Sequence, residues 1–174
     1  MIDYFKEEFL IQSKKQRAKT LNIYLIVLLL YISLSAVVLI RYMQLPYQAP
    51  QIGVIKTVEF IMTFIFLVFS FVYLGIKYKR VNKFYEMCKN ISIGIKEEFT
   101  ANFFEYDENL SVKDGVDVKS LVFLQWNKFK NDYFERKVFV FYEKPFPEFK
   151  PNDEVRFITQ GNVLVSYEII EEEN

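Results

Sequence analysis

Two long apolar runs without charged residues dominate the first half of the chain. The first is Leu21–Ile40, and the second has its uncharged centre at Phe60–Ile76. Each is close to the length of about 20 residues that an α-helix needs to cross a bilayer. The pattern predicts a transmembrane helical hairpin. A cleaved signal peptide is disfavoured, because the first run is too long and a second run follows it.

Basic residues flank this hairpin on one side only. They are Lys14, Lys15, Arg17 and Lys19 before the first run, and Lys77, Lys79, Arg80 and Lys83 after the second. By the positive-inside rule, both termini are expected in the cytoplasm. The high usage of Phe, Tyr, Ile, Asn and Lys is typical of an AT-rich bacterial genome, so the expected location is a bacterial cytoplasmic (inner) membrane.

The net charge of zero hides two halves of opposite sign. Residues 1–83 hold 11 Lys/Arg and 4 Asp/Glu, a net charge of +7, whereas residues 84–174 hold 11 Lys/Arg and 18 Asp/Glu, a net charge of −7. The cationic half suits the anionic lipids of the inner leaflet. The acidic half argues against nucleic acid as a partner, because phosphate binding needs a basic face.

After Lys83 the pattern changes to the alternation typical of β-strands. The sequence predicts a strand beginning at Ile91–Ile95 and further strands over 120–126, 137–143, 154–159 and 163–170. Residues 144–153 hold three prolines and cannot lie centrally in a sheet. About six or seven short strands favour a small all-β domain, a barrel or sandwich of PH-like, OB or SH3 type, because closure removes exposed edges.

The predicted organisation follows from these patterns. Its segments are a cytoplasmic amphipathic N-terminal segment (1–20), a first transmembrane helix (21–40), a short external loop (41–53), a second transmembrane helix (54–76), a basic exit linker (77–90), a cytoplasmic β domain (91–170) and an acidic tail (171–174). The N-terminal segment has apolar residues at Ile2, Phe5 and Phe9. It can lie on the inner leaflet or pack on the β domain.

Aromatic strands relate this order of segments to a known family. The turn-rich pair FFEYDENLSVKDG, the strand FLQWNKFKN and the strand YFERKVFVFYEK carry the similarity through Trp126, Phe129, Phe139, Phe141 and Tyr142. The chain resembles the YcxB-like family of small bacterial membrane proteins. The resemblance implies a pleckstrin-homology-like β domain on two spans. It implies no particular reaction and no functional residues.

The chain lacks most residue types that carry out catalysis. It has no His, which removes the commonest metal ligand and general base, and one Cys, Cys88. Five glycines form no phosphate-binding loop, and the acidic residues lack the spacing of a calcium loop. We expect no catalytic residue, no metal, no cofactor and no enzymatic activity. Cys88 is either a small packed residue or a juxtamembrane palmitoylation site.

Two groups of residues are candidates for a binding role. Trp126, Phe129 and Tyr142 are candidate contacts to a ligand or partner, with a buried structural role as the alternative for Trp126. The second group is Lys56, Glu59 and Arg41, a candidate membrane ion pair near the outer boundary. The alternative for Glu59 is a proton or ion pathway.

A regular apolar stripe runs along the second span. Its members recur at helical spacing and are Phe60, Phe64, Leu67, Phe71 and Leu74. The stripe can pack against another helix, face lipid or, as a third reading, line a ligand pocket.

Together these features predict a non-enzymatic protein that presents a small cytoplasmic β-rich binding or sensing domain on a two-helix anchor. Its expected partners are the lipid bilayer and a protein or a second copy bound through the helices. One alternative is a membrane-disrupting or pore-forming antiphage effector, triggered by a small nucleotide or a protein signal at the β domain. Another is an accessory subunit of a transporter or secretion complex, docked through the Phe-rich second span.

Overall fold

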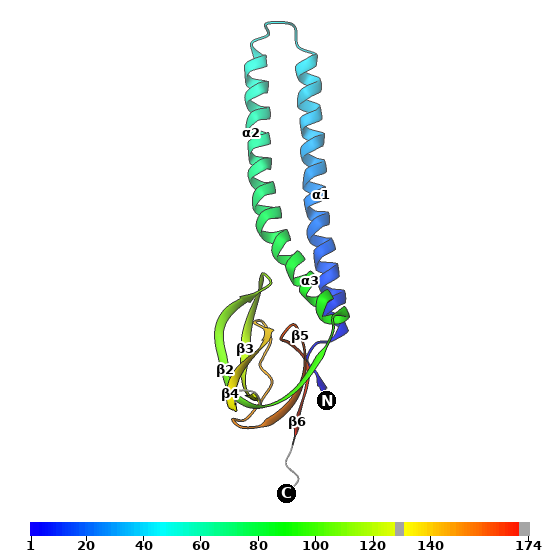
Figure 1. The fold of residues 1–174 in the computed structure, drawn as a ribbon. Helices are drawn as coiled ribbons and strands as arrows, with labels where there is room; N and C mark the ends of the chain where they lie inside the picture. The colour runs from blue at the N-terminus through cyan, green and yellow to red at the C-terminus, as the bar shows by residue number, and fades with distance from the viewer. Residues whose placement is uncertain (128–130, 171–174) are drawn as a thin grey trace. The chain divides into compact units, whose positions relative to one another are not determined.

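The computed structural model describes residues 1–127 and 131–170 (Figure 1). In chain order the elements are β1 (Ile2–Asp3), α1 (Glu7–Met43), α2 (Gln51–Val72), the π-helical segment η1 (Tyr73–Tyr78), α3 (Lys79–Ile93), β2 (Glu97–Lys113), β3 (Val116–Asn127), β4 (Asp132–Phe141), β5 (Glu154–Gln160) and β6 (Val163–Ile170). The chain forms two compact units. We call Lys14–Asn82 the hairpin unit, and Met1–Ser13 with Lys83–Asn174 the barrel unit.

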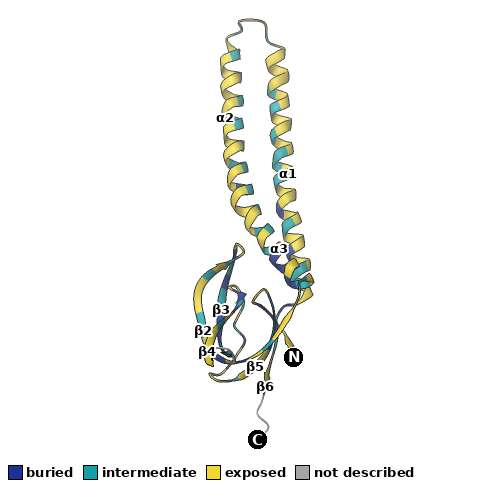
Figure 2. Cartoon of the chain, viewed as in Figure 1, coloured by how far each residue is buried: buried dark blue, intermediate teal, exposed yellow. Residues whose placement is uncertain are grey.

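The hairpin unit consists of two long apolar helices. By length and composition, both are able to cross a membrane. Their most apolar windows are 0% and 6% buried, and Figure 2 shows both helices coloured mainly as exposed. The core helix of a soluble protein would be mostly buried instead. The exposed apolar surface of these helices is consistent with insertion into lipid.

Both helices continue well beyond the apolar runs. α1 begins at Glu7, inside the predicted N-terminal segment, and η1 and α3 extend the second helix to Ile93. Residues 77–90, expected as a linker, are therefore helical. The predicted strand at Ile91–Ile95 is wrong, because Ile91 belongs to α3, where Met87, Cys88 and Ile91 share a buried face at helical spacing.

The connection between α1 and α2 is short and irregular. α1 ends at Met43, and α2 begins at Gln51 directly after its N-cap residue Pro50. Within the connection, Gln48 has a φ of 73°. Pro46 and Pro50 suit this position, because proline ends one helix readily and is tolerated at the start of the next.

β2 to β6 close into a five-stranded mixed barrel. β2 pairs with β3 and β5, β3 with β4, and β5 with β6, all antiparallel. A parallel pairing of β4 with β6 at Phe139 and Val163 closes the ring. Closure leaves no long free edge, which is the reason a small β domain prefers a barrel. A sandwich, the other predicted closure, is not formed.

Tight turns join neighbouring strands of the barrel, and the proline segment lies outside the sheet as predicted. The β5–β6 turn has positive φ values at Gly161 and Asn162, and the β2–β3 turn has them at Asp114 and Gly115. Such values are typical of tight hairpin turns. Residues 142–153, with their three prolines, connect β4 to β5 without joining the sheet.

Two apolar clusters hold the barrel unit together. The inner cluster fills the barrel and consists of Ala101, Phe103, Leu121, Phe123, Val138, Val140, Phe149, Val155, Phe157 and Leu164. The outer cluster consists of Phe5, Met87, Cys88, Ile91, Val116, Val118, Phe141, Val163 and Val165. Because successive residues of a strand face opposite sides, Phe141 points outward where Val140 points inward. The outer cluster thus packs α3 and the N-terminal segment onto the barrel wall.

The N-terminal segment packs on the β domain, as one of its two predicted placements requires. β1 pairs with β6, matching Ile2 with Tyr167 and Asp3 with Ser166. The backbone N–H groups of Tyr4 and Phe5 both donate to the carbonyl oxygen of Val165, at 2.9 Å. This segment therefore extends the sheet and brings Phe5 into the outer cluster.

Replacing Phe123 with Ala is expected to lower the free energy of unfolding of the barrel by about 3–5 kcal/mol. Its fully buried ring stacks on Phe157 at 4.4 Å and contacts Phe103 edge to face at 5.7 Å. Urea titration of the full chain in detergent, followed by fluorescence of the single tryptophan, measures the change. Leu110→Ala is the control, because Leu110 is exposed and should change stability by less than about 0.5 kcal/mol. Equal losses in both variants would contradict the assignment of the core.

Candidate functional site

The facing sides of the hairpin helices carry a row of polar contacts. Tyr24 Oη donates to Ser70 Oγ at 3.4 Å, Tyr31 Oη bonds Thr63 Oγ1 at 3.0 Å, and Ser35 Oγ donates to Glu59 Oε1 at 2.7 Å. Towards the other end, Tyr73 Oη donates to the carbonyl oxygen of Thr20 at 3.0 Å, and Arg17 Nε donates to Tyr78 Oη at 3.4 Å. The register is constant, since seven residues from Tyr24 to Tyr31 match seven from Ser70 back to Thr63.

Aromatic rings fill the space between these polar contacts. Tyr31 stacks on Phe66 with ring centroids 4.2 Å apart and planes within 1°. Tyr24 stacks near Phe66, Phe69 and Tyr73, at 6.2–6.4 Å. In lipid, helices associate through van der Waals packing and interhelical hydrogen bonds rather than through the hydrophobic effect. The hairpin has both kinds of contact, so contacts between α1 and α2 themselves determine how the two helices pack.

The predicted Phe stripe lies beside the face of α2 that bonds α1. Phe60, Phe64, Leu67 and Phe71 are exposed, whereas Leu74, in η1, is half-buried. At 3.6 residues per turn, the stripe is about a quarter turn away from the residues that bond α1, which are Glu59, Thr63 and Ser70. The four exposed members therefore remain available to lipid or to a partner.

Arg41, Lys56 and Glu59 do not form the predicted ion pair in the described part of the chain. Glu59 accepts the hydrogen bond of Ser35, and its second oxygen, Oε2, is buried without a hydrogen-bond partner in the structure. Lys56 Nζ lies 5.8 Å from the ring centroid of Tyr42. Ser35 was not singled out by the sequence, although a serine in an apolar run opposite an acid is the signal that could have found it.

Removing the ring of Tyr31 is expected to weaken the helix pair more than removing its hydroxyl. Tyr31→Phe keeps the stack on Phe66 and should cost about 0.6 kcal/mol, the usual value of an interhelical hydrogen bond in a membrane protein. Tyr31→Ala also loses the stack, which adds about 0.5–1.5 kcal/mol. Unfolding by sodium dodecyl sulfate in mixed micelles measures both. Leu30→Ala, at an exposed neighbouring position, is the control, and an effect as large as that of Tyr31→Ala would contradict the packing.

Trp126 is exposed, not a buried anchor. It lies opposite Tyr133 in the β3–β4 register, and the two rings meet edge to face at 4.9 Å. Trp126 is 44% exposed and Tyr133 58% exposed. Two rigid strands thus present an aromatic pair to solvent, an arrangement suited to stacking or protein contact. We call Trp126 and Tyr133 the aromatic pair.

The other two candidate contacts do not join this pair. Phe129 lies outside the described residues. Tyr142 directly follows β4 and donates its backbone N–H to the carbonyl oxygen of Asp117 at 3.2 Å. Nine residues separate it from Tyr133, about 30 Å along an extended strand. Trp126 and Tyr142 therefore belong to opposite ends of the β3–β4 hairpin.

Arg136 is a half-buried charged residue on the inward-facing side of β4 that the sequence did not reveal. It lies opposite the interior residue Phe123, and its guanidinium carbon is 3.3 Å from the ring centroid of Phe99. Its nitrogens donate to Gln125 Oε1 at 2.9 Å and Asn162 Oδ1 at 3.4 Å. Burial lowers the pKa of Arg136, and the Glu97 carboxylate partly opposes this effect. The stacking on Phe99 compensates the buried charge.

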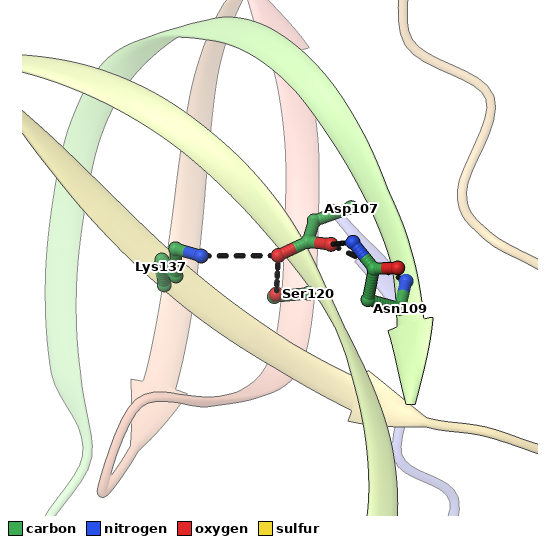
Figure 3. A network of polar contacts seen from close by, with 4 residues as sticks. All are labelled: Asp107, Asn109, Ser120 and Lys137. Carbon is green, nitrogen blue, oxygen red and sulfur yellow. Dashed lines mark hydrogen bonds and ion pairs between the residues drawn. The ribbon is translucent and has the colours of Figure 1, made fainter. Parts of the chain in front are cut away.

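Asp107 is the centre of a polar network on the barrel wall (Figure 3). Its Oδ2 accepts hydrogen bonds from Lys137 Nζ at 3.0 Å and Ser120 Oγ at 3.2 Å. Its Oδ1 accepts from the backbone N–H and side-chain amide of Asn109 at 3.2 and 2.8 Å. The network joins β2, β3 and β4 where the β2–β3 register shifts after Asp107.

These donors keep Asp107 ionised at neutral pH. The hydrogen bond from Lys137, followed by those from Asn109, lowers its pKa from 3.8 to about 2. A general acid or base works best with a pKa near the operating pH, so the carboxylate does not suit proton transfer. Its hydrogen bonds instead connect β2, β3 and β4 and stabilise their packing.

Lys144 is held among aromatic rings of the barrel unit. Its Nζ lies 3.0 Å from the ring centroid of Phe9 and 5.1 Å from that of Tyr4, and it donates to the carbonyl oxygen of Tyr4 at 3.4 Å. Burial lowers the pKa of Lys144 to about 8.

Cys88 is fully buried in the outer cluster, and burial raises the pKa of its thiol. A buried thiol suits the packed role proposed for Cys88 and not acylation.

Among the described residues, no group of three or more acidic or cysteine side chains is arranged to hold a metal ion. No protein-family model, curated protein or solved structure matches the chain. The physical features of the two units are therefore the basis for a functional proposal.

Replacing Asp107 with Asn should lower stability at neutral pH and remove part of its acid dependence. The folded-state pKa is depressed, so this stabilisation is present above about pH 4 and is lost as the pH falls towards about 2. Wild type and Asp107→Asn should thus differ in unfolding free energy at pH 7 and converge near pH 2. Urea titrations across this range provide the measurement. Glu108→Gln, at the exposed neighbour, should follow wild type; a constant gap between wild type and Asp107→Asn would contradict the mechanism.

Proposed function

We propose that the protein is a non-enzymatic membrane-anchored binding protein, in which the hairpin unit is the anchor and the barrel unit is the binding module. The observation that carries this proposal is the contrast between the two units. The apolar windows of the helices are almost entirely exposed, whereas the barrel buries its own core. Each unit thus suits a different solvent, lipid for the helices and water for the barrel.

The strand order supports classification of the barrel as an OB type. In such barrels the first strand pairs with the second and fourth, and the third and fifth strands are parallel neighbours. β2 to β6 have this order. OB-type barrels bind their ligands mainly on the second and third strands. In this chain these are β3 and β4, which carry the aromatic pair. The inference from fold to site is an architectural analogy.

The net charge of the barrel-containing half of the chain favours some ligand classes of such barrels over others. The net charge of −7 over residues 84–174 disfavours a nucleic-acid strand, whose phosphates need a basic groove. Exposed tyrosine and tryptophan side chains on rigid strands are the residues that most often dominate protein–protein interfaces. We therefore propose a protein partner for the aromatic pair, at the cytoplasmic side predicted by the basic flanks.

The exposed Phe stripe of α2 supports a second candidate, an accessory role in a larger membrane complex. Four large apolar side chains are exposed along one side of α2 and are not used in its packing against α1. They are Phe60, Phe64, Leu67 and Phe71. A pore-forming effector has less support, because the polar side chains between α1 and α2 bond one another and leave no continuous polar face.

A photo-crosslinking amino acid at Tyr133 should capture a partner in cells, whereas the same group at Leu110 should not. Leu110 is the matched control, because it is exposed on β2 of the same barrel. Trp126→Ala should reduce the adduct at least about tenfold, as expected for truncation of a central interface residue. Equal adducts from both positions, or an adduct insensitive to Trp126→Ala, would contradict a site at the aromatic pair.

The same cells test the anchor. Carbonate extraction at high pH should leave the full chain in the membrane pellet. Release of the chain into the supernatant would show that the helices do not span the bilayer.

A further inference from the structure

The hairpin unit contains a groove at its turn end. The groove has a volume of about 540 Å³ and lies between the last turns of α1 and the first turns of α2. Its apolar lining consists of Val37, Val38, Leu45, Val54, Ile55 and Val58. Its polar lining consists of Arg41, Gln44 and Gln51. Val37, Val54 and Val58 are also 48–65% exposed to the surroundings, so the groove is open along its side.

The groove exists because the side chains that lie between α1 and α2 become smaller towards the turn. Stacked rings fill the interface as far as Tyr31 and Phe66, and in the described part of the chain the Ser35–Glu59 hydrogen bond is the side-chain hydrogen bond between the helices that lies nearest the turn. Beyond that bond, the lining residues of both helices are mostly Val and Ile. These side chains are too short to fill the gap. The groove therefore lies on the turn side of the Ser35–Glu59 contact.

Arg41 is the only cation among the residues that line the groove. It directly follows the Leu21–Ile40 run, whose helical length of about 30 Å matches the hydrocarbon thickness of a bilayer. This places Arg41 at the depth of lipid phosphates on the turn side. In the described part of the chain, Arg41 has neither an ion pair nor a hydrogen bond, and no acidic residue lines the groove.

We propose that this groove binds an anionic phospholipid, with one acyl chain against the Val and Ile side chains and the phosphate beside Arg41. The proposal rests on the membrane insertion proposed above. An apolar groove that opens into a bilayer fills with hydrocarbon, since water has no hydrogen-bond partners along its wall. Arg41 then adds selectivity for negative charge, and the amides of Gln44 and Gln51 can donate to headgroup oxygens. A basic pocket between transmembrane helices is a recurrent way of holding an anionic headgroup.

The groove explains why a cation lies on the side that the positive-inside rule leaves nearly free of them. Lys56, the other cation near this end, lies over the ring of Tyr42 and does not line the groove. Neutralising Arg41 and neutralising Lys56 should therefore affect lipid selectivity differently. Arg41 should determine lipid selectivity, and Lys56 should not.

Native mass spectrometry of the full chain, purified in detergent and supplied with equal phosphatidylglycerol and phosphatidylcholine, tests the proposal. Wild type should retain phosphatidylglycerol preferentially. Arg41→Gln should reduce this preference about fivefold, the effect expected for one basic residue at a membrane surface. Lys56→Gln, with the same loss of charge, should retain it. Val38→Trp, which fills the groove, should lower retention of both lipids while leaving the thermal unfolding of the barrel unchanged.

Three outcomes would overturn the inference. The first is an undiminished preference in Arg41→Gln, and the second is an equal loss in Lys56→Gln, which would indicate general attraction of charge. The third is displacement of the lipid by inorganic phosphate, which would indicate a site for a free anion. If the chain is released from membranes by carbonate, the anchor itself fails. If it stays inserted but retains both lipids equally, the anchor stands and the lipid site fails.

Discussion

The outer cluster is the interaction on which the rest of the barrel unit depends. It brings together three parts of the chain that are distant in sequence: the segment before α1, the helix α3 and the barrel wall. Phe5, Cys88 and Val118 represent these parts. Both chain connections of the hairpin unit therefore lead into the barrel unit. Lys144, held by the rings of Tyr4 and Phe9, adds a cation–π contact to this junction.

The two units distribute polarity in opposite ways. The barrel buries aromatic and aliphatic side chains and exposes its charges, as a domain in water does. The hairpin exposes Phe and Leu and turns Tyr31, Ser35 and Glu59 towards its own interior. In lipid a polar group finds no partner outside the protein, so hydrogen bonds between helices take over the role of apolar burial. The distribution of polar side chains in the hairpin unit is therefore consistent with lipid as its surroundings.

Sequence patterns predicted elements well where one local cause acted alone. The apolar runs, the strands over 154–159 and 163–170 and the proline segment are of this kind. They failed at Ile91–Ile95, where alternating isoleucines suggested a strand. There the helical spacing of Met87 and Ile91 prevailed, because the barrel wall offered α3 a surface to cover. Arg136 and Asp107 were also missed, since their partners come from strands far apart in sequence and no spacing signals them.

The sequence by itself determined that the chain has two long apolar helices followed by a β-rich domain. It also determined that the two halves of the chain carry net charges of opposite sign. These properties depend on local composition, which acts before any tertiary contact forms. Only the tertiary structure decided that the N-terminal segment joins the sheet, that Trp126 is exposed and that Ser35, not Lys56, is the partner of Glu59. Each of these depends on strand register or helix rotation. Register and rotation are set by the summed packing of many residues, and no single residue encodes them.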